Sequence, residues 1–148
     1  MTAGTELTES GTLLYRQVPL IHLPGGKVSS AAFVPGPNHQ SLLSTRHETV
    51  GAKRAYLEFI AANNSTEGSW AVTVGEVRTN GVCEDIAPYL DEFLNGAPEG
   101  HVSIDFNPSP STSATKRIAK HLSRRAQARG RIHPPTVEES QEPEPAEA

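Results

Sequence analysis

The sequence of 148 residues has little of what builds covalent frameworks or membrane spans. It contains a single cysteine, Cys83, and aromatic residues make up only 5% of the chain. One cysteine excludes an intrachain disulfide, which favours a reducing compartment for so small a domain. No apolar run approaches the roughly 18–20 residues that span a bilayer, and the polar N-terminus lacks a signal-peptide pattern. We therefore expect a cytoplasmic protein that makes no use of a membrane.

Several motifs that mark known chemistry are also missing. The sequence has no glycine-rich phosphate loop, no paired Cys-x-x-Cys, no His-Glu-x-x-His and no Gly-x-Ser-x-Gly. Its six histidines are scattered, so we expect no metal site. The length suits one domain, and 12 glycines with 12 prolines argue against a long coiled coil. These absences favour a protein that is not an enzyme and carries no cofactor, without excluding catalysis.

The formal net charge of −4 conceals three blocks of different sign. Residues 1–115 carry six basic and twelve acidic side chains, a balance of −6. Residues 116–131 carry seven basic side chains and no acidic one, whereas residues 132–148 carry five glutamates and no Lys or Arg. Such blocks bear on partners and solubility more than on the fold.

Hydrophobic periodicity predicts a series of short elements. The strands are expected at residues 12–21, 27–35, 41–45, 70–74 and 101–106, and the helices at residues 49–64 and 113–129, with a short helix after Pro88. This order indicates an α+β fold, a small, mostly antiparallel sheet with two or three helices on one face. We expect a single domain over residues 12–131, a disordered N-terminus over 1–11 and a disordered acidic, Pro/Glu-rich tail over 132–148.

One candidate site lies on the first two predicted strands. Arg16 could bind a phosphate or dinucleotide beside the hydroxyls of Ser29 and Ser30. This arrangement resembles the opening strands of ADP-ribosyltransferase-like folds, and the resemblance implies NAD as a ligand. Asp105 stands where those folds place a late glutamate. The alternative is a structural Arg16 at a strand edge, paired with a carboxylate such as Asp105.

A second resemblance covers most of the predicted domain. The segments Leu14 to Gln17, Val28 to Phe33, Trp70 to Val74 and His101 to Phe106 precede a basic C-terminal helix. In these features the chain resembles a group of small uncharacterised bacterial proteins. That resemblance implies a bacterial origin and a shared fold, and it implies no chemistry.

His101 and Asp105 form a further candidate pair. They lie four residues apart on a predicted strand, so they share a face but are separated by about 13 Å along it. This distance is too long for a hydrogen bond, although both could line one cleft around Ser103. The alternative is a polar strand face in contact with solvent.

The predicted C-terminal helix carries the strongest charge. Its basic residues recur at helical spacing, and those expected to bind a partner are Lys116, Arg117, Lys120, Arg124, Arg125 and Arg129. Such a stripe could neutralise the phosphates of a nucleic acid. It could instead be a solvated outer face, or it could match the acidic body or tail. Because no aromatic residue follows Phe106, stacking on single-stranded bases is not indicated.

The leading hypothesis is therefore a small interaction module. We expect it to bind a protein or nucleic-acid partner through the basic helix. The alternative is a nucleotide- or NAD-processing enzyme that uses Arg16, Ser29 or Ser30, and Asp105. The oligomeric state does not follow from the sequence.

Overall fold

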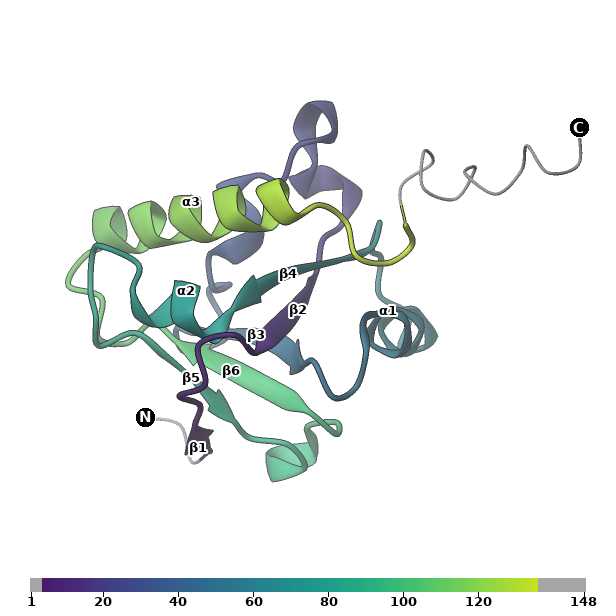
Figure 1. Cartoon of the computed structure of the whole chain (residues 1–148), viewed down its shortest axis with the longest axis horizontal. Coiled ribbons are helices and arrows are strands. Elements are labelled where there is room, and N and C mark those ends of the chain that lie inside the picture. The colour runs from purple at the N-terminus through teal and green to yellow at the C-terminus, as the bar shows by residue number, and fades with distance from the viewer. Residues whose placement is uncertain (1–3, 136–148) are drawn as a thin grey trace, which may run out of the picture.

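A six-stranded antiparallel sheet forms the centre of the molecule. The computed structural model describes residues 4–135, and Figure 1 shows their arrangement. The strands are β1 (Thr5–Glu6), β2 (Leu13–Gln17), β3 (Leu42–His47), β4 (Ser69–Thr73), β5 (Ala87–Leu90) and β6 (His101–Asp105). Their order across the sheet is β1-β5-β6-β3-β2-β4. All neighbouring strands run antiparallel, which confirms the predicted fold class.

The helices cover the two faces of this sheet unequally. They are α1 (Ala52–Ala61), α2 (Val74–Arg78) and α3 (Thr112–Arg129), with short 3₁₀ turns η1 (Leu20–His22), η2 (Pro24–Gly26), η3 (Ser30–Phe33) and η4 (Leu94–Gly96). The long helix α3 and the short helix α2 share one face, whereas α1 packs on the opposite face near β2 and β4 (Figure 1). No helix within residues 4–135 combines the length and the apolar character that crossing a bilayer requires.

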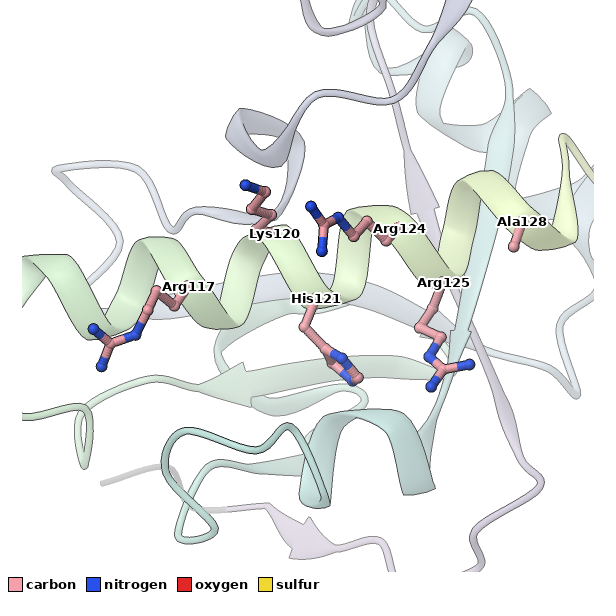
Figure 2. A pocket seen from close by; sticks show the side chains of 6 residues that line it. All are labelled: Arg117, Lys120, His121, Arg124, Arg125 and Ala128. Atoms are coloured by element: carbon pink, nitrogen blue, oxygen red, sulfur yellow. The ribbon is translucent and has the colours of Figure 1, made fainter.

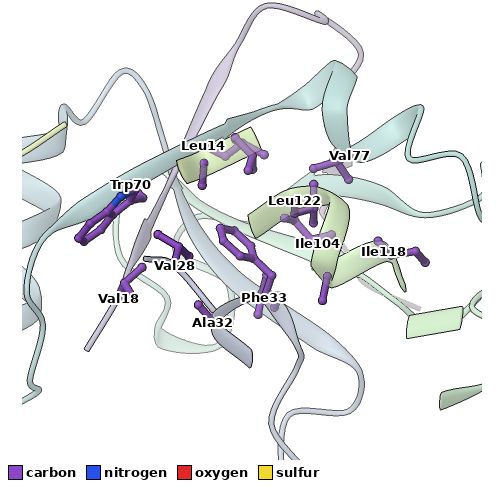
Figure 3. Packing of buried hydrophobic residues seen from close by; sticks show 14 of the residues in the cluster. Leu14, Val18, Val28, Ala32, Phe33, Trp70, Val77, Ile104, Ile118 and Leu122 are labelled. Atoms are coloured by element: carbon purple, nitrogen blue, oxygen red, sulfur yellow. The ribbon is translucent and has the colours of Figure 1, made fainter. Parts of the chain in front are cut away.

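The main core lies between the sheet and α3. Strand positions of one parity, such as Leu14, Val72 and Ile104, are fully buried there. From α3, Ile118 and Leu122 project into the same cluster, as Figure 3 shows. Phe33 is also completely buried, because the η3 turn lays it against α3. The alternating strand pattern and the four-residue helical spacing therefore meet in one apolar layer.

A second, smaller cluster lies on the other face. Ala52 and Ala55 of α1 pack against Tyr15 and Ala71, which have the opposite parity on β2 and β4. Small residues on α1 let the helix approach the sheet closely. Helix α1 packs on β2 and β4. The polar side chains of β3 and β6 on this face therefore lie beside the helix and not beneath it.

Residues 27–35 do not form the strand that the sequence predicts. They form η3, whose start is capped by the Ser29 hydroxyl, which accepts a hydrogen bond from the Ala31 amide at 3.1 Å. A serine before a run of small residues favours such a local turn over strand pairing. The prediction of a second strand here is wrong, because the small residues Ser29 to Ala32, which it placed in the middle of a strand, form the capped turn instead.

The short helix predicted after Pro88 is also replaced. Residues 87–90 form β5 instead, and the Pro88 carbonyl accepts a hydrogen bond from the Leu7 amide at 2.9 Å. A helix forms earlier, at α2, where Thr73 and Glu76 make a reciprocal capping box. This Thr-x-x-Glu motif is present in the sequence. The helix was not predicted because the strand expected at residues 70–74 includes its capping residue, Thr73.

Both ends of the domain extend further than predicted. Thr5–Glu6 pairs with β5 as β1, within the N-terminal segment expected to be disordered. At the other end, the backbone of Ile132 and His133 pairs with Ser69, so the ordered chain passes residue 131. Gly68 permits this contact, since a Cβ there would lie 2.7 Å from the His133 carbonyl oxygen. The predicted disorder at 1–3 and 136–148 lies outside the described residues.

Candidate functional site

Helix α3 presents the predicted basic surface on a well-anchored element. The Ser111 hydroxyl caps its start by accepting the Ala114 amide at 3.0 Å, and Gly130, with φ of 87°, ends it. Ala114, Ile118, Leu122 and Ala126 are buried, as their four-residue spacing predicts. The cationic side chains therefore occupy the outer side of the helix.

Five of these cations form what we call the basic face: Lys116, Arg117, Lys120, Arg124 and Arg125. All five residues are exposed. Within residues 4–135, none of them lies within 4.0 Å of a carboxylate oxygen. They span about 13 Å of the helix axis and about half its circumference. The side chains of Arg117 and Arg125 project on one flank of α3, and Lys120 and Arg124 on another (Figure 2).

A surface hollow of about 540 Å³ runs along this face. It is lined by six residues of α3, among them Arg117, Arg124, Arg125 and His121. The His121 ring lies with Nε2 3.2 Å from the Glu76 carbonyl oxygen, on the flank that faces α2 (Figure 2). The hollow is therefore lined mostly by cationic side chains and is open to a partner.

Arg129 behaves differently from the rest of the predicted stripe. Its guanidinium donates to Glu76 Oε2 at 2.8 Å and to the Ala71 carbonyl at 2.9 Å. Burial raises the pKa of Glu76, but the hydrogen bonds from Arg129 and from the Thr73 amide outweigh it and hold that pKa below its usual value. Arg129 thus joins α3 to α2 and β4, which assigns it a structural role rather than a place in the free surface.

Arg16, the first residue of the nucleotide hypothesis, also bonds to the backbone. Its Nε donates to the Ala32 carbonyl at 2.8 Å and its Nη1 to the Ser44 carbonyl at 3.0 Å. Burial lowers the pKa of Arg16 to about 10, and within residues 4–135 no carboxylate lies within 4.0 Å of it. Arg16 therefore does not form the predicted pair with Asp105.

The other members of that hypothesis lie elsewhere. Ser29 caps η3, Ser30 begins that turn, and Asp105 accepts hydrogen bonds from the backbone and side chain of Asn107. The pocket that Arg16 lines has none of these three residues in its walls. The geometry accordingly gives no support to an NAD site built from Arg16, Ser29, Ser30 and Asp105.

The structure supplies a different partner for His101. Its Nδ1 lies 2.6 Å from Asp91 Oδ1, and its Nε2 lies 3.2 Å from the hydroxyl oxygen of Ser44. Ser103 donates to the second oxygen of Asp91 at 2.6 Å. Asp91 follows β5, a segment that the sequence assigned to a helix, so its approach to His101 was not predictable from spacing.

No group of three or more His, Cys, Asp or Glu side chains in the described part of the chain could hold a metal ion. Comparisons with protein-family models, with curated proteins and with solved structures find no match to this chain. The case for a function therefore depends on the chemistry of the surfaces above.

Proposed function

We propose that the protein binds double-stranded nucleic acid through the basic face of α3. The observation that carries this proposal is the presence of five exposed cations on one helix, none of which lies within 4.0 Å of a carboxylate oxygen of residues 4–135. About 13 Å of duplex carries about eight phosphates, which is enough to meet all five cations. Binding would release condensed counterions, and this release drives association without sequence specificity.

The contrast with other arginines of the protein supports this assignment. Arg46, Arg54, Arg78 and Arg129 each form an ion pair with a glutamate. Their charge is matched within the domain, whereas no carboxylate of the described residues pairs with the basic face. A cluster of like charges repels itself, and an anionic partner relieves this repulsion.

A double-stranded partner fits better than a single-stranded one. The only ring on the exposed side of α3 is the imidazole of His121, and α3 carries no Phe, Tyr or Trp. Proteins that bind single strands without sequence preference stack bases on aromatic side chains. Arginine and lysine contacts to a duplex backbone require no such platform.

A matched pair of double variants tests the proposal. Lys120→Gln/Arg124→Gln removes two charges from the basic face, and Lys27→Gln/Lys53→Gln removes two exposed charges elsewhere. We expect the first to weaken binding of a short fluorescent duplex, measured by anisotropy, by about tenfold or more, and the second to have little effect. Equal affinity of both variants would overturn the proposal, as would a folded wild-type protein that binds only acidic proteins and no duplex at low salt.

A further inference from the structure

Asp91, His101 and Ser44 form one continuous chain of hydrogen bonds on the sheet face opposite α3. Ser44 lies within β3, His101 begins β6, and Asp91 follows β5. Arg46 is the cross-strand partner of His101, so Ser44 lies diagonally from the histidine on the same face. Three segments distant in sequence thus bring a hydroxyl, an imidazole and a carboxylate into one line.

The hydrogen bonds fix the direction of this chain. Asp91 accepts a hydrogen bond from Ser103 and, as a carboxylate, accepts another from His101 Nδ1. In the neutral imidazole, Nε2 is then the acceptor and faces the Ser44 hydroxyl. The side chains of His101 and Asp91 are only 18% and 14% exposed, so packing restricts the ring further. Ser44 itself is exposed.

A pocket of about 200 Å³ opens onto the reacting end of the chain. Ser44 and His101 line it together with the apolar side chains of Ala55 and Phe59 from α1. Arg16 also belongs to the pocket wall, but its guanidinium is turned to the α3 side of the sheet, where Nε donates to the Ala32 carbonyl of η3. The pocket therefore combines a hydroxyl, a base and an apolar wall.

We propose that this pocket is an esterase site for small carboxylic esters, with Ser44 as the nucleophile and His101 as the general base. Nucleophilic catalysis needs a hydroxyl beside a base and a third group that orients the base, and such sets occur on unrelated folds. Asp91 is the positioning residue, since it holds the imidazole through Nδ1. The Ser44 to His101 distance of 3.2 Å lies at the upper end of the range for such pairs.

The reaction requires only the ester and water. Ser44 Oγ bonds to the ester carbonyl carbon while its proton moves to His101 Nε2, and the electrons of the carbonyl double bond move onto the carbonyl oxygen. The ester C–O bond then breaks, and the alcohol leaves with the proton from His101. Water attacks the acylated Ser44, giving its proton to His101, and the carboxylic acid leaves as that proton returns to Ser44.

Covalent labelling tests the nucleophile directly. A fluorophosphonate probe should form a P–O bond to Ser44 and release fluoride, and peptide mass mapping should place the adduct there. Ser44→Ala should abolish labelling, whereas Ser41→Ala, which changes an exposed serine three residues earlier, should not. Absence of an adduct on Ser44 in folded wild-type protein, or an equal loss in both variants, would overturn the proposal.

Kinetics with p-nitrophenyl acetate test the other two residues. Substitutions of triad members lower rates by several orders of magnitude, so we expect His101→Gln to lower kcat/KM by about 100-fold or more. Asp91→Asn should lower kcat to a similar degree with KM nearly unchanged, as a positioning role requires. If either variant keeps both the melting temperature and the kcat of the wild type, the proposed roles of His101 and Asp91 are contradicted. This site is independent of the basic face, so either proposal can fail alone.

Discussion

The two sides of α3 differ in the interactions they make. On the inner side, Ile118 and Leu122 are fully buried against the sheet. On the outer side, the five cations of the basic face have no carboxylate partner within residues 4–135. Arg129 lies at the boundary and ties the helix to Glu76. One helix can therefore contribute to stability through its inner residues and to recognition through its outer residues. Substitutions on the two sides should separate these roles.

The largest expected effect comes from the inner side. Leu122→Ala removes a completely buried side chain and leaves a cavity, so the free energy of unfolding should fall by about 2–5 kcal/mol. Chemical denaturation monitored by circular dichroism measures this change. A loss smaller than about 1 kcal/mol would mean that α3 does not pack on the sheet as described.

A smaller effect is expected at the boundary. Arg129→Ala removes an ion pair with Glu76 and a hydrogen bond to the Ala71 carbonyl. With the Arg129 side chain 28% exposed, the loss should be about 1 kcal/mol. The matched variant Arg124→Ala, on the basic face, should change stability by less than about 0.5 kcal/mol. Equal losses in the two variants would remove the distinction between them.

The pH dependence of that boundary provides a finer test. The pKa of Glu76 is lower in the folded protein than its usual value. Its stabilising contribution is therefore present above the unfolded pKa and is lost as the pH falls through the folded pKa. The stability difference between wild type and Arg129→Ala should accordingly shrink below about pH 4, as measured by denaturation at several pH values. A difference that is constant down to acid pH would contradict this linkage.

Local patterns predicted helix α3 and strand β6 well. The four-residue spacing from Ala114 to Ala126 places these residues in the core, and the alternation at 101–106 matches β6. Periodicity is visible in sequence because one stripe of α3 and one parity of β6 join the apolar core. On the other face of β6, the polar residues Ser103 and Asp105 are buried as well. The resulting α+β architecture followed from the order of such elements.

Features that depend on strand pairing or on local capping were much less predictable, on both faces of the sheet. Asp91 reaches His101 only because β5 and β6 pair, and the Pro88 segment had been assigned to a helix. Ser29 and Ser30 do not line the pocket of Arg16, because the Ser29 hydroxyl caps a local turn that begins at Ser30. Contacts between distant segments depend on strand pairing and on capping, which hydrophobic spacing does not encode.

The salt dependence of duplex binding tests the central claim most directly. Each neutralised phosphate contributes a slope of about −0.9 to a plot of log affinity against log salt concentration. Five cations on the basic face therefore predict a slope of about −4 to −5 between about 50 and 200 mM salt. A slope near zero, or no binding to duplex at the lowest salt, would contradict the assignment of this face to nucleic acid.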